Sequence, residues 1–257
     1  MRDILAVIPA RYRSSRLPGK PLVDIAGKPM IVRTWERCAG VVDPENVVVA
    51  TDDRRIADVC AEHGIWAEMT RDDHPTGGDR VHEISTRIPA HTYVNVQGDE
   101  PVMNRNDLRA LIAAAREDRD AVLTGYCPMP ESQWRDSKYI KLLFGHDKNL
   151  IYIGRAQVPG SHSGQYTFAY RPVCLYADSR QSLELFASVE GRTRIEAVED
   201  HEIMRFLEMD HPVRVVEMSD QSMPVDRPLD VELVEAYLAE HGGEAPDAPV
   251  TPPAAAQ

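Results

Sequence analysis

The chain has 257 residues, of which 43% are hydrophobic and 27% charged, a balance typical of a globular protein with one large or two small domains. Its formal net charge of −12 argues against general nucleic-acid binding, which needs a basic face. No apolar run approaches the roughly eighteen residues of a membrane span, and the N-terminus enters an apolar stretch at once, which leaves no room for a signal peptide. The four cysteines have no metal-type spacing and predict reduced core thiols in a cytoplasmic protein.

The first strong pattern is an apolar run over residues 4–8, followed by a basic loop punctuated by proline and glycine. The run predicts a buried parallel strand, so the loop leaves the carboxyl end of that strand, where open α/β sheets bind ligands. The loop carries four cations within ten residues: Arg11, Arg13, Arg16 and Lys20. Because guanidinium groups suit phosphate oxygens, we expect a polyphosphate site here rather than a solvated basic loop.

Strand and helix patterns then alternate along the chain. Residues 30–39 have helical spacing, residues 47–50 predict a strand, and residues 54–63 predict a helix that ends at Gly64. This repetition indicates βαβ units and a mostly parallel sheet, so the expected fold class is α/β, Rossmann-like, with helices on the sheet. Between strand and helix, Asp52 or Asp53 is expected to cap the helix rather than to bind a ligand.

Two further segments carry candidate site residues. In HPTGGDRVHE (residues 74–83), the glycines give either backbone amides that face a ligand or a turn that caps a helix. In YVNVQGDEP (residues 93–101), a strand ends just before Asp99 and Glu100. Mg²⁺ prefers one or two carboxylates together with substrate phosphates, so Asp99 is a candidate metal ligand.

The remainder of the chain is less regular. We expect a helix over residues 106–118 capped by Asn104 or Asn106, a strand over 121–125, and two strands of an irregular insertion at 139–143 and 149–158. A helix over 231–241 is expected to be capped by Asp226 or, better by position, by Asp230. Residues 242–257 are rich in Pro and Ala without periodicity and predict a disordered tail.

Several strings together resemble one enzyme family. PARYRSSRLPGKPL, VNVQGDEP and MPVDRPLD are similar to segments of the 3-deoxy-manno-octulosonate (Kdo) cytidylyltransferases, and the resemblance spans about residues 4–240. It implies a single nucleotidyltransferase domain over residues 1–241 that transfers CMP from CTP to a small acidic acceptor and releases pyrophosphate, with Mg²⁺ held by Asp99 and Asp226. The implied catalytic residues are Lys20, Arg11, Arg16 and Asp99. The implied nucleotide-binding residues are Ala10, Arg11, Ser14, Arg16, Lys20, Gly77, Arg80, Gln97 and Asp99.

On the acceptor side, the resemblance implies an insertion over about residues 128–195, a homodimer, and a set of acceptor-binding residues. That set is Lys141, Arg155, Glu196, Glu199 and Asp226. Here the chain departs from the family: Pro172 stands for a His, Cys174 for a Gly, and Ile203 for a Gln. Two interpretations of these substitutions stay open. They are either sequence drift among enzymes that use Kdo, or a change of specificity to a smaller acceptor such as phosphonoformate. A nucleotide-binding regulator without turnover is a more remote alternative, because both candidate metal carboxylates are retained.

Overall fold

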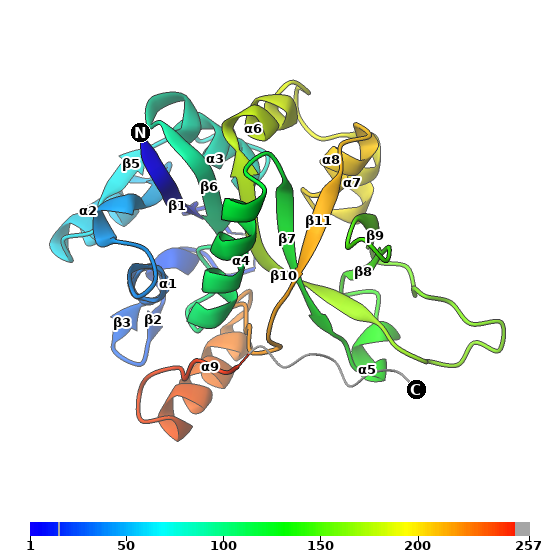
Figure 1. Ribbon diagram of the computed structural model, residues 1–257. Coiled ribbons are helices and arrows are strands. Elements are labelled where there is room, and N and C mark those ends of the chain that lie inside the picture. The colour runs from blue at the N-terminus through cyan, green and yellow to red at the C-terminus, as the bar shows by residue number, and fades with distance from the viewer. Residues whose placement is uncertain (15, 250–257) are drawn as a thin grey trace.

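A twisted, mostly parallel β-sheet runs through the middle of the molecule in the computed structural model, which describes residues 1–14 and 16–249 (Figure 1). The strand order is β11-β7-β10-β6-β1-β4-β5, with β8 and β9 attached beside β10. The strands are β1 (Arg2–Ala10), β4 (Val47–Thr51), β5 (Ala67–Met69), β6 (Ala90–Val96), β7 (Val122–Pro128), β8 (Lys141–Phe144), β9 (Leu150–Gly154), β10 (Tyr170–Ser179) and β11 (Val213–Glu217). The α/β class predicted from the alternation of strands and helices is therefore confirmed.

The apolar run at the N-terminus forms the centre of this sheet. Leu5 to Ile8 of β1 are completely buried, and β1 pairs in parallel with β4 on one side and β6 on the other. Alternate residues of β1 face different helices: Ile4, Ala6 and Ile8 lie in one apolar cluster, and Leu5 and Val7 lie in another. A strand buried on both faces needs a continuous apolar run, which is what residues 4–8 supply.

Helices cover both faces of the sheet. α1 (Met30–Ala39), α2 (Arg54–Glu62) and α4 (Arg105–Glu117) contribute to the first cluster, whereas α3 (Gly77–Arg87) and α6 (Arg180–Ala187) contribute to the second. The remaining helices are α5 (Glu131–Trp134), α7 (Arg194–Glu199), α8 (Met204–Glu208) and α9 (Pro228–Glu240). Short elements complete the chain: the hairpin β2 (Asp24–Ile25) and β3 (Lys28–Pro29), and the 3₁₀ turns η1 (Lys20–Leu22) and η2 (Pro44–Asn46).

The helix caps predicted from the sequence are confirmed for two helices and wrong for a third. Asp53 caps α2 by accepting from the amide of Arg55, and Asn104 rather than Asn106 caps α4. For α9, the predicted caps Asp226 and Asp230 are both wrong, because the helix begins earlier, at Pro228. Asp230 instead occupies the third position of the helix, where its carboxylate accepts from the amides of Asp226 and Arg227.

The expected insertion over residues 128–195 does not form one unit. β10 lies between β6 and β7 and runs antiparallel to both, so it belongs to the central sheet. The other elements of this stretch, α5, β8, β9 and the loop before β10, lie on the side of the molecule away from α2 (Figure 1), and β8 pairs with β10. The sequence alternation in residues 170–179 could not indicate this position, because strand order depends on contacts between distant segments.

The predicted disordered tail is corrected in its first half. Residues 242–249 run back along α1 and α4: Ala245 is buried, Arg37 of α1 donates to Asp247 and to the carbonyl of Ala245, and Asn104 donates to the carbonyl of Ala248. The cationic residues on these helices hold a segment whose composition alone predicts no order. Residues 250–257 lie outside the described part of the chain.

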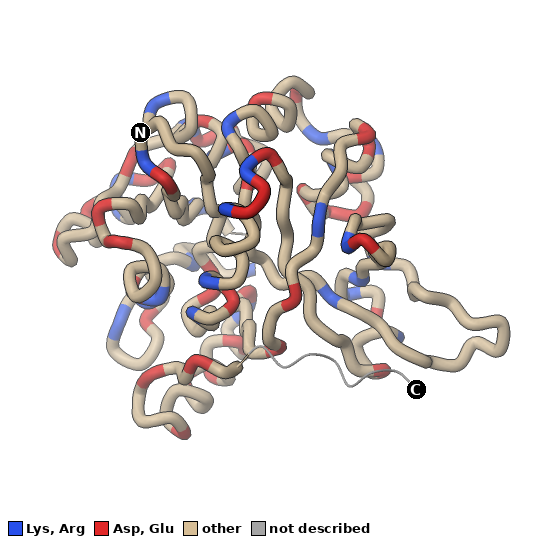
Figure 2. Tube along the Cα trace, viewed as in Figure 1, with Lys and Arg blue, Asp and Glu red and all other residues tan. Residues whose placement is uncertain are grey.

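Acidic and basic residues are interspersed along the trace (Figure 2). Among the described residues, no helix combines the length and the apolar character needed to cross a bilayer.

Candidate active site

A cavity of about 340 Å³ opens where β1 and β6 end, facing the beginning of α3. All nine residues that were predicted to bind the nucleotide line it, although they come from three separate segments of the sequence. Parallel strands bring their carboxyl ends to one edge, and this is why the loops after β1 and β6 meet there. Gly98 allows the close approach, because a Cβ at this position would lie only 2.8 Å from the carbonyl oxygen of Pro9.

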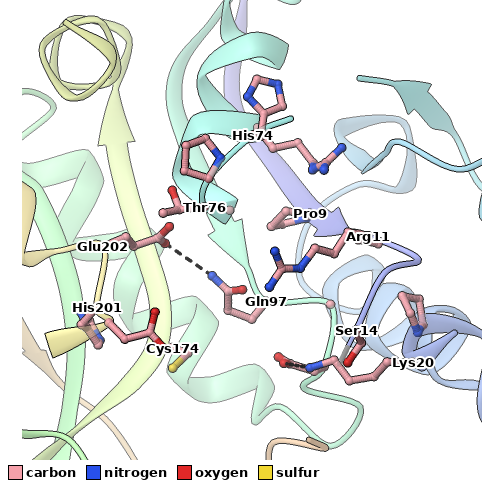
Figure 3. Close-up of a pocket in the computed structure, with 18 of the residues that line it drawn as sticks. Pro9, Arg11, Ser14, Lys20, His74, Thr76, Gln97, Cys174, His201 and Glu202 are labelled. Atoms are coloured by element: carbon pink, nitrogen blue, oxygen red, sulfur yellow. Dashed lines mark hydrogen bonds and ion pairs between the residues drawn. The ribbon is translucent and has the colours of Figure 1, made fainter. Parts of the chain in front are cut away.

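The basic loop after β1 forms one wall of the cavity. Arg11, Ser14, Arg16 and Lys20 line it, and Arg11, Ser14 and Lys20 lie together on one side of the close-up view (Figure 3). The loop is closed by a hydrogen bond from the amide of Gly19 to the carbonyl of Tyr12, and Gly19 adopts a left-handed backbone conformation that favours glycine. Arg13 does not line the cavity. The exposed guanidinium of Arg11 has no charged partner among the described residues, so it is available to an anion.

Lys20 joins the two predicted metal carboxylates. Its Nζ lies 2.6 Å from Oδ2 of Asp99 and 3.1 Å from Oδ1 of Asp226, and Arg16 donates to the same oxygen of Asp226 at 3.0 Å. Burial acts to lower the pKa of Lys20, but the two carboxylates outweigh it and raise the pKa above its ordinary value. Two carboxylate oxygens thus converge on one positive charge, the arrangement that a divalent cation also requires.

The segment around Gly77 and Gly78 begins α3, so the helix-cap alternative describes it correctly. Thr76 caps the helix in a reciprocal capping box with Asp79, and the amide of Gly78 donates to Glu202 at 2.8 Å. Gly77 still lines the cavity, where a Cβ would lie 3.3 Å from the side-chain nitrogen of Gln97. This crowding is enough to explain why residue 77 is a glycine. Its backbone amide need not bind a ligand.

Arg80 and Asp52 connect the wall to the loop after β1. Arg80 is buried, and it donates to Asp52, to Thr70 and to the carbonyl of Arg71. Asp52 also accepts from the amide of Tyr12 at 3.4 Å. The prediction that Asp52 or Asp53 caps the helix is confirmed for Asp53, and Asp52 instead contacts the basic loop through the amide of Tyr12.

None of the five predicted acceptor-binding residues is among the residues that line the cavity. Lys141 is buried and donates to the carbonyls of Asp136, Tyr139 and Arg155, so its ammonium is fully used. Arg155 donates to backbone carbonyls of Ser137, Lys138 and Glu199. Of this set, only Asp226 contacts the basic loop, where it accepts hydrogen bonds from Lys20 and Arg16.

Glu196 and Glu199 are turned away from the cavity by a break between α7 and α8. α7 ends at Glu199, Asp200 adopts a left-handed conformation with φ of 54°, and α8 begins only at Met204. Glu196 pairs with the buried Arg205, and Glu199 accepts from Tyr152 and from the amide of Arg155. Beyond the break, His201 and Glu202 face the cavity. Asp tolerates this backbone conformation, but its presence alone does not predict the break.

The wall of the cavity opposite the basic loop is built from residues that the sequence did not single out as site residues. They are Cys174 and Tyr176 of β10, Arg192, Asp200, His201 and Glu202. Arg192 and Asp200 form an ion pair of 2.7 Å at this wall. Of the three positions that depart from the family, only Cys174 lines the cavity; Pro172 does not, and Ile203 is buried in an apolar cluster with Phe206 and Tyr176. Glutamates recur every third residue here, at 196, 199 and 202, and no local signal in the sequence distinguishes Glu202 from Glu196.

The geometry defines a class of protein before any comparison. A basic loop follows the first buried strand of an α/β sheet, and two carboxylates lie beside that loop. This fold and this site are those of a nucleotidyltransferase. The chain belongs to the cytidylyltransferase family, whose model matches residues 5–220.

Individual relatives agree with this assignment. The chain is 40% identical to a 3-deoxy-manno-octulosonate cytidylyltransferase from Syntrophotalea carbinolica, over 92% of this chain and 98% of the relative. It is 33% identical to the enzyme of that name from Escherichia coli, over 95% and 99% of the two chains. A solved structure of CMP:2-keto-3-deoxy-manno-octonic acid synthetase complexed with CTP superposes with a TM-score of 0.88 at 33% identity, covering 93% of this chain and 99% of that one. The expectations of a Kdo-type cytidylyltransferase fold and of an enzyme are confirmed.

Proposed function

We propose that this enzyme transfers CMP from CTP to Kdo, or to a closely related 2-keto sugar acid, and releases pyrophosphate. The observation that carries the proposal is Lys20, held between Asp99 and Asp226 beside a cavity whose opposite wall would take the acceptor. The names of the relatives support Kdo as the acceptor.

The residues of the basic loop act mainly by position and charge. Arg11, Arg16 and Lys20 would hold the triphosphate of CTP, while Gln97 lies deeper between the two walls (Figure 3). An acceptor hydroxyl oxygen forms a bond to the α-phosphorus and gives up its proton to solvent, the bond from that phosphorus to the bridging oxygen breaks, and pyrophosphate leaves. Little covalent chemistry is required of the protein, so orientation and neutralisation of charge lower the barrier.

Magnesium fits the donor set of this site. Asp99 and Asp226 would hold the ion, because both offer hard carboxylate oxygens next to the phosphate loop and already converge on a cation. A bound divalent cation supplies charge neutralisation at the transferring phosphate. Lys20 contacts only one oxygen of each carboxylate, so among the described residues Oδ1 of Asp99 and Oδ2 of Asp226 are left for the ion.

Phosphonoformate remains the alternative acceptor to be tested. The lost His and Gln of the family argued for a smaller acceptor, but neither Pro172 nor Ile203 lines the cavity. Only Cys174 changes the wall itself. The observations therefore favour a sugar acid over a small phosphonate.

The decisive experiment measures pyrophosphate release from CTP with Kdo, phosphonoformate and a panel of other acids. Efficient turnover of Kdo alone would support the proposal. Turnover of phosphonoformate without turnover of Kdo would overturn it.

The homodimer and the cytoplasmic location stay predictions. Exposed apolar side chains on β9 and α7, namely Ile151, Ile195 and Val198, are suited to a contact between two copies. The four cysteines are free thiols, as a reducing compartment would keep them.

A further inference from the structure

Arg192 supplies a positive charge on the wall of the cavity opposite the basic loop. Among the described residues, the other arginines and lysines that line the cavity belong to the basic loop or to α3, where Arg80 is buried and pairs with Asp52. The two cations that the family resemblance implied for the acceptor, Lys141 and Arg155, do not line the cavity and donate to backbone carbonyls. Arg192 therefore takes the place on this wall that was expected of them.

The guanidinium group of Arg192 is accessible and only partly used. Its Nη1 donates to Oδ1 of Asp200 at 2.7 Å, and the side chain makes no other hydrogen bond among the described residues. The side chain of Arg192 is 34% exposed and that of Asp200 is 63% exposed, so the ion pair is not sealed from a ligand. Nε and Nη2 form the edge with which Arg55 holds both oxygens of Asp53, and at Arg192 this edge has no partner in the described part of the chain.

The ion pair lies at the cavity and faces the basic loop. Both of its members line the cavity, and Asp200 lies two positions before Glu202, which is across the cavity from Lys20 in the close-up view (Figure 3). The hydrogen bond from Arg192 lowers the pKa of Asp200, and further positive charges, including that of Arg16 in the basic loop, act in the same direction. Asp200 is therefore within electrostatic reach of the loop on the other side of the cavity.

A sugar acid brings a carboxylate into a site that already holds much negative charge. The triphosphate of CTP is anionic, and Asp200 and Glu202 place carboxyl groups on the wall that faces it. Because like charges repel strongly when water is partly excluded, the incoming carboxylate needs a cation on this wall. A guanidinium group matches a carboxylate in two parallel hydrogen bonds and stays charged at every pH at which the protein is folded.

We propose that Arg192 is an acceptor-specificity residue whose open edge, formed by Nε and Nη2, binds the carboxylate of the sugar acid. The inference rests on the proposed function and deepens it, because it names the group that recognises the acid. Asp200 keeps the guanidinium in place through Nη1. The turn between α7 and α8 that carries Asp200 thereby contributes to the acceptor site without contacting the acceptor itself.

The test removes the charge of the arginine and, separately, the charge of the acceptor. Arg192→Gln loses the guanidinium, and Arg192→Lys keeps a charge without the two-pronged edge. Asp200→Asn removes the ion pair but keeps an oxygen that can accept from Nη1. Arg194→Gln is the matched control, because Arg194 is an exposed arginine two residues away that does not line the cavity. Pyrophosphate release is measured with CTP and either Kdo or its neutral carboxamide.

We expect Arg192→Gln to lower kcat/KM for Kdo by about 5- to 50-fold and to leave kcat/KM for the carboxamide within about twofold of the wild type. The preference for the acid over the carboxamide then shrinks by nearly the same factor. KM for CTP should change by less than about twofold. Arg192→Lys should recover part of the loss, whereas Asp200→Asn and Arg194→Gln should both retain the preference for the acid.

The outcomes separate this inference from the function on which it rests. An unchanged preference for the acid in Arg192→Gln, or a loss that appears in KM for CTP instead, would overturn the inference while the proposed function stands. If Asp200→Asn lost the preference to the same extent as Arg192→Gln, the arginine would serve the ion pair alone, and the inference would again be wrong. A wild-type enzyme that does not turn over Kdo would overturn the proposed function and this inference with it.

Discussion

Replacement of Lys20 by glutamine tests the centre of the site most directly. The substitution keeps a side chain of similar length and polarity but removes the ammonium that lies 2.6 Å from Asp99 and 3.1 Å from Asp226. A hydrogen bond to a charged group contributes about 1.5–3 kcal/mol, so loss of the contact to the triphosphate should lower kcat/KM for CTP by about 10- to 150-fold. Because the carboxylates raise the pKa of Lys20, the lysine stays charged through neutral pH, and the ratio of the two enzymes should be constant between about pH 7 and 9.

The assay follows pyrophosphate release against CTP concentration at saturating Kdo, with the melting temperature as a check on folding. Lys28→Gln is the matched control, because Lys28 forms a 2.8 Å pair with Glu36 in which both side chains are 40% or more exposed. Exposed pairs contribute about 0–1 kcal/mol, so this variant should remain close to the wild type. If Lys20→Gln retained kcat/KM within about threefold of the control, Lys20 would not be a triphosphate contact.

Three further predictions address the metal, the fold and the pH dependence. Asp99→Asn should abolish pyrophosphate release while the fold and metal-free CTP binding persist, and near-normal release would rule out Asp99 as a metal ligand. Arg205→Met leaves the buried Glu196 without its ion-pair partner and should lower the free energy of unfolding by about 3–5 kcal/mol in urea titrations. An unchanged midpoint would show that this ion pair does not stabilise the fold. Burial, helped by Glu202, raises the pKa of Asp178 to about 8, so the folded state holds a proton that the unfolded chain releases near pH 4, and wild-type stability should fall as pH rises from about 4 to 8. Asp178→Asn should flatten that decline, and curves that stay parallel between the variant and the wild type would contradict the assignment.

The nucleotide half of the site could be predicted from sequence because its geometry is local. The basic loop with Arg11 and Lys20 follows β1, Asp99 follows β6, and the parallel pairing of β1 with β6 brings the two loops together. A run of apolar residues followed by a charged loop is therefore sufficient to place them. The fold class followed from the same alternation of strands and helices.

The acceptor half could not be predicted because it depends on long-range contacts and on one backbone conformation. Lys141 has the chemistry of an anion-binding residue, but folding surrounds its ammonium with backbone carbonyls. Glu196 and Glu202 look equivalent in the sequence, and only the left-handed Asp200 between them turns one toward Arg205 and the other toward the cavity. The antiparallel course of β10, which carries Cys174 and Tyr176, is equally invisible in a pattern of apolar residues.

The place of β10 has a consequence for synthesis of the chain on the ribosome. Strands β6 and β7 do not pair with each other, because β10 separates them, so in a nascent chain that ends after β7 the facing edges of both strands are unpaired. These edges remain open until residue 179 has emerged, and chaperone binding or aggregation can compete during that interval. The phosphate loop and Asp99 precede β10 in the chain, whereas the opposite wall arrives with it and after it. A protein divided after β7 would thus separate the two substrate-binding walls as well as the sheet, and complementation of the two halves would have to restore both together.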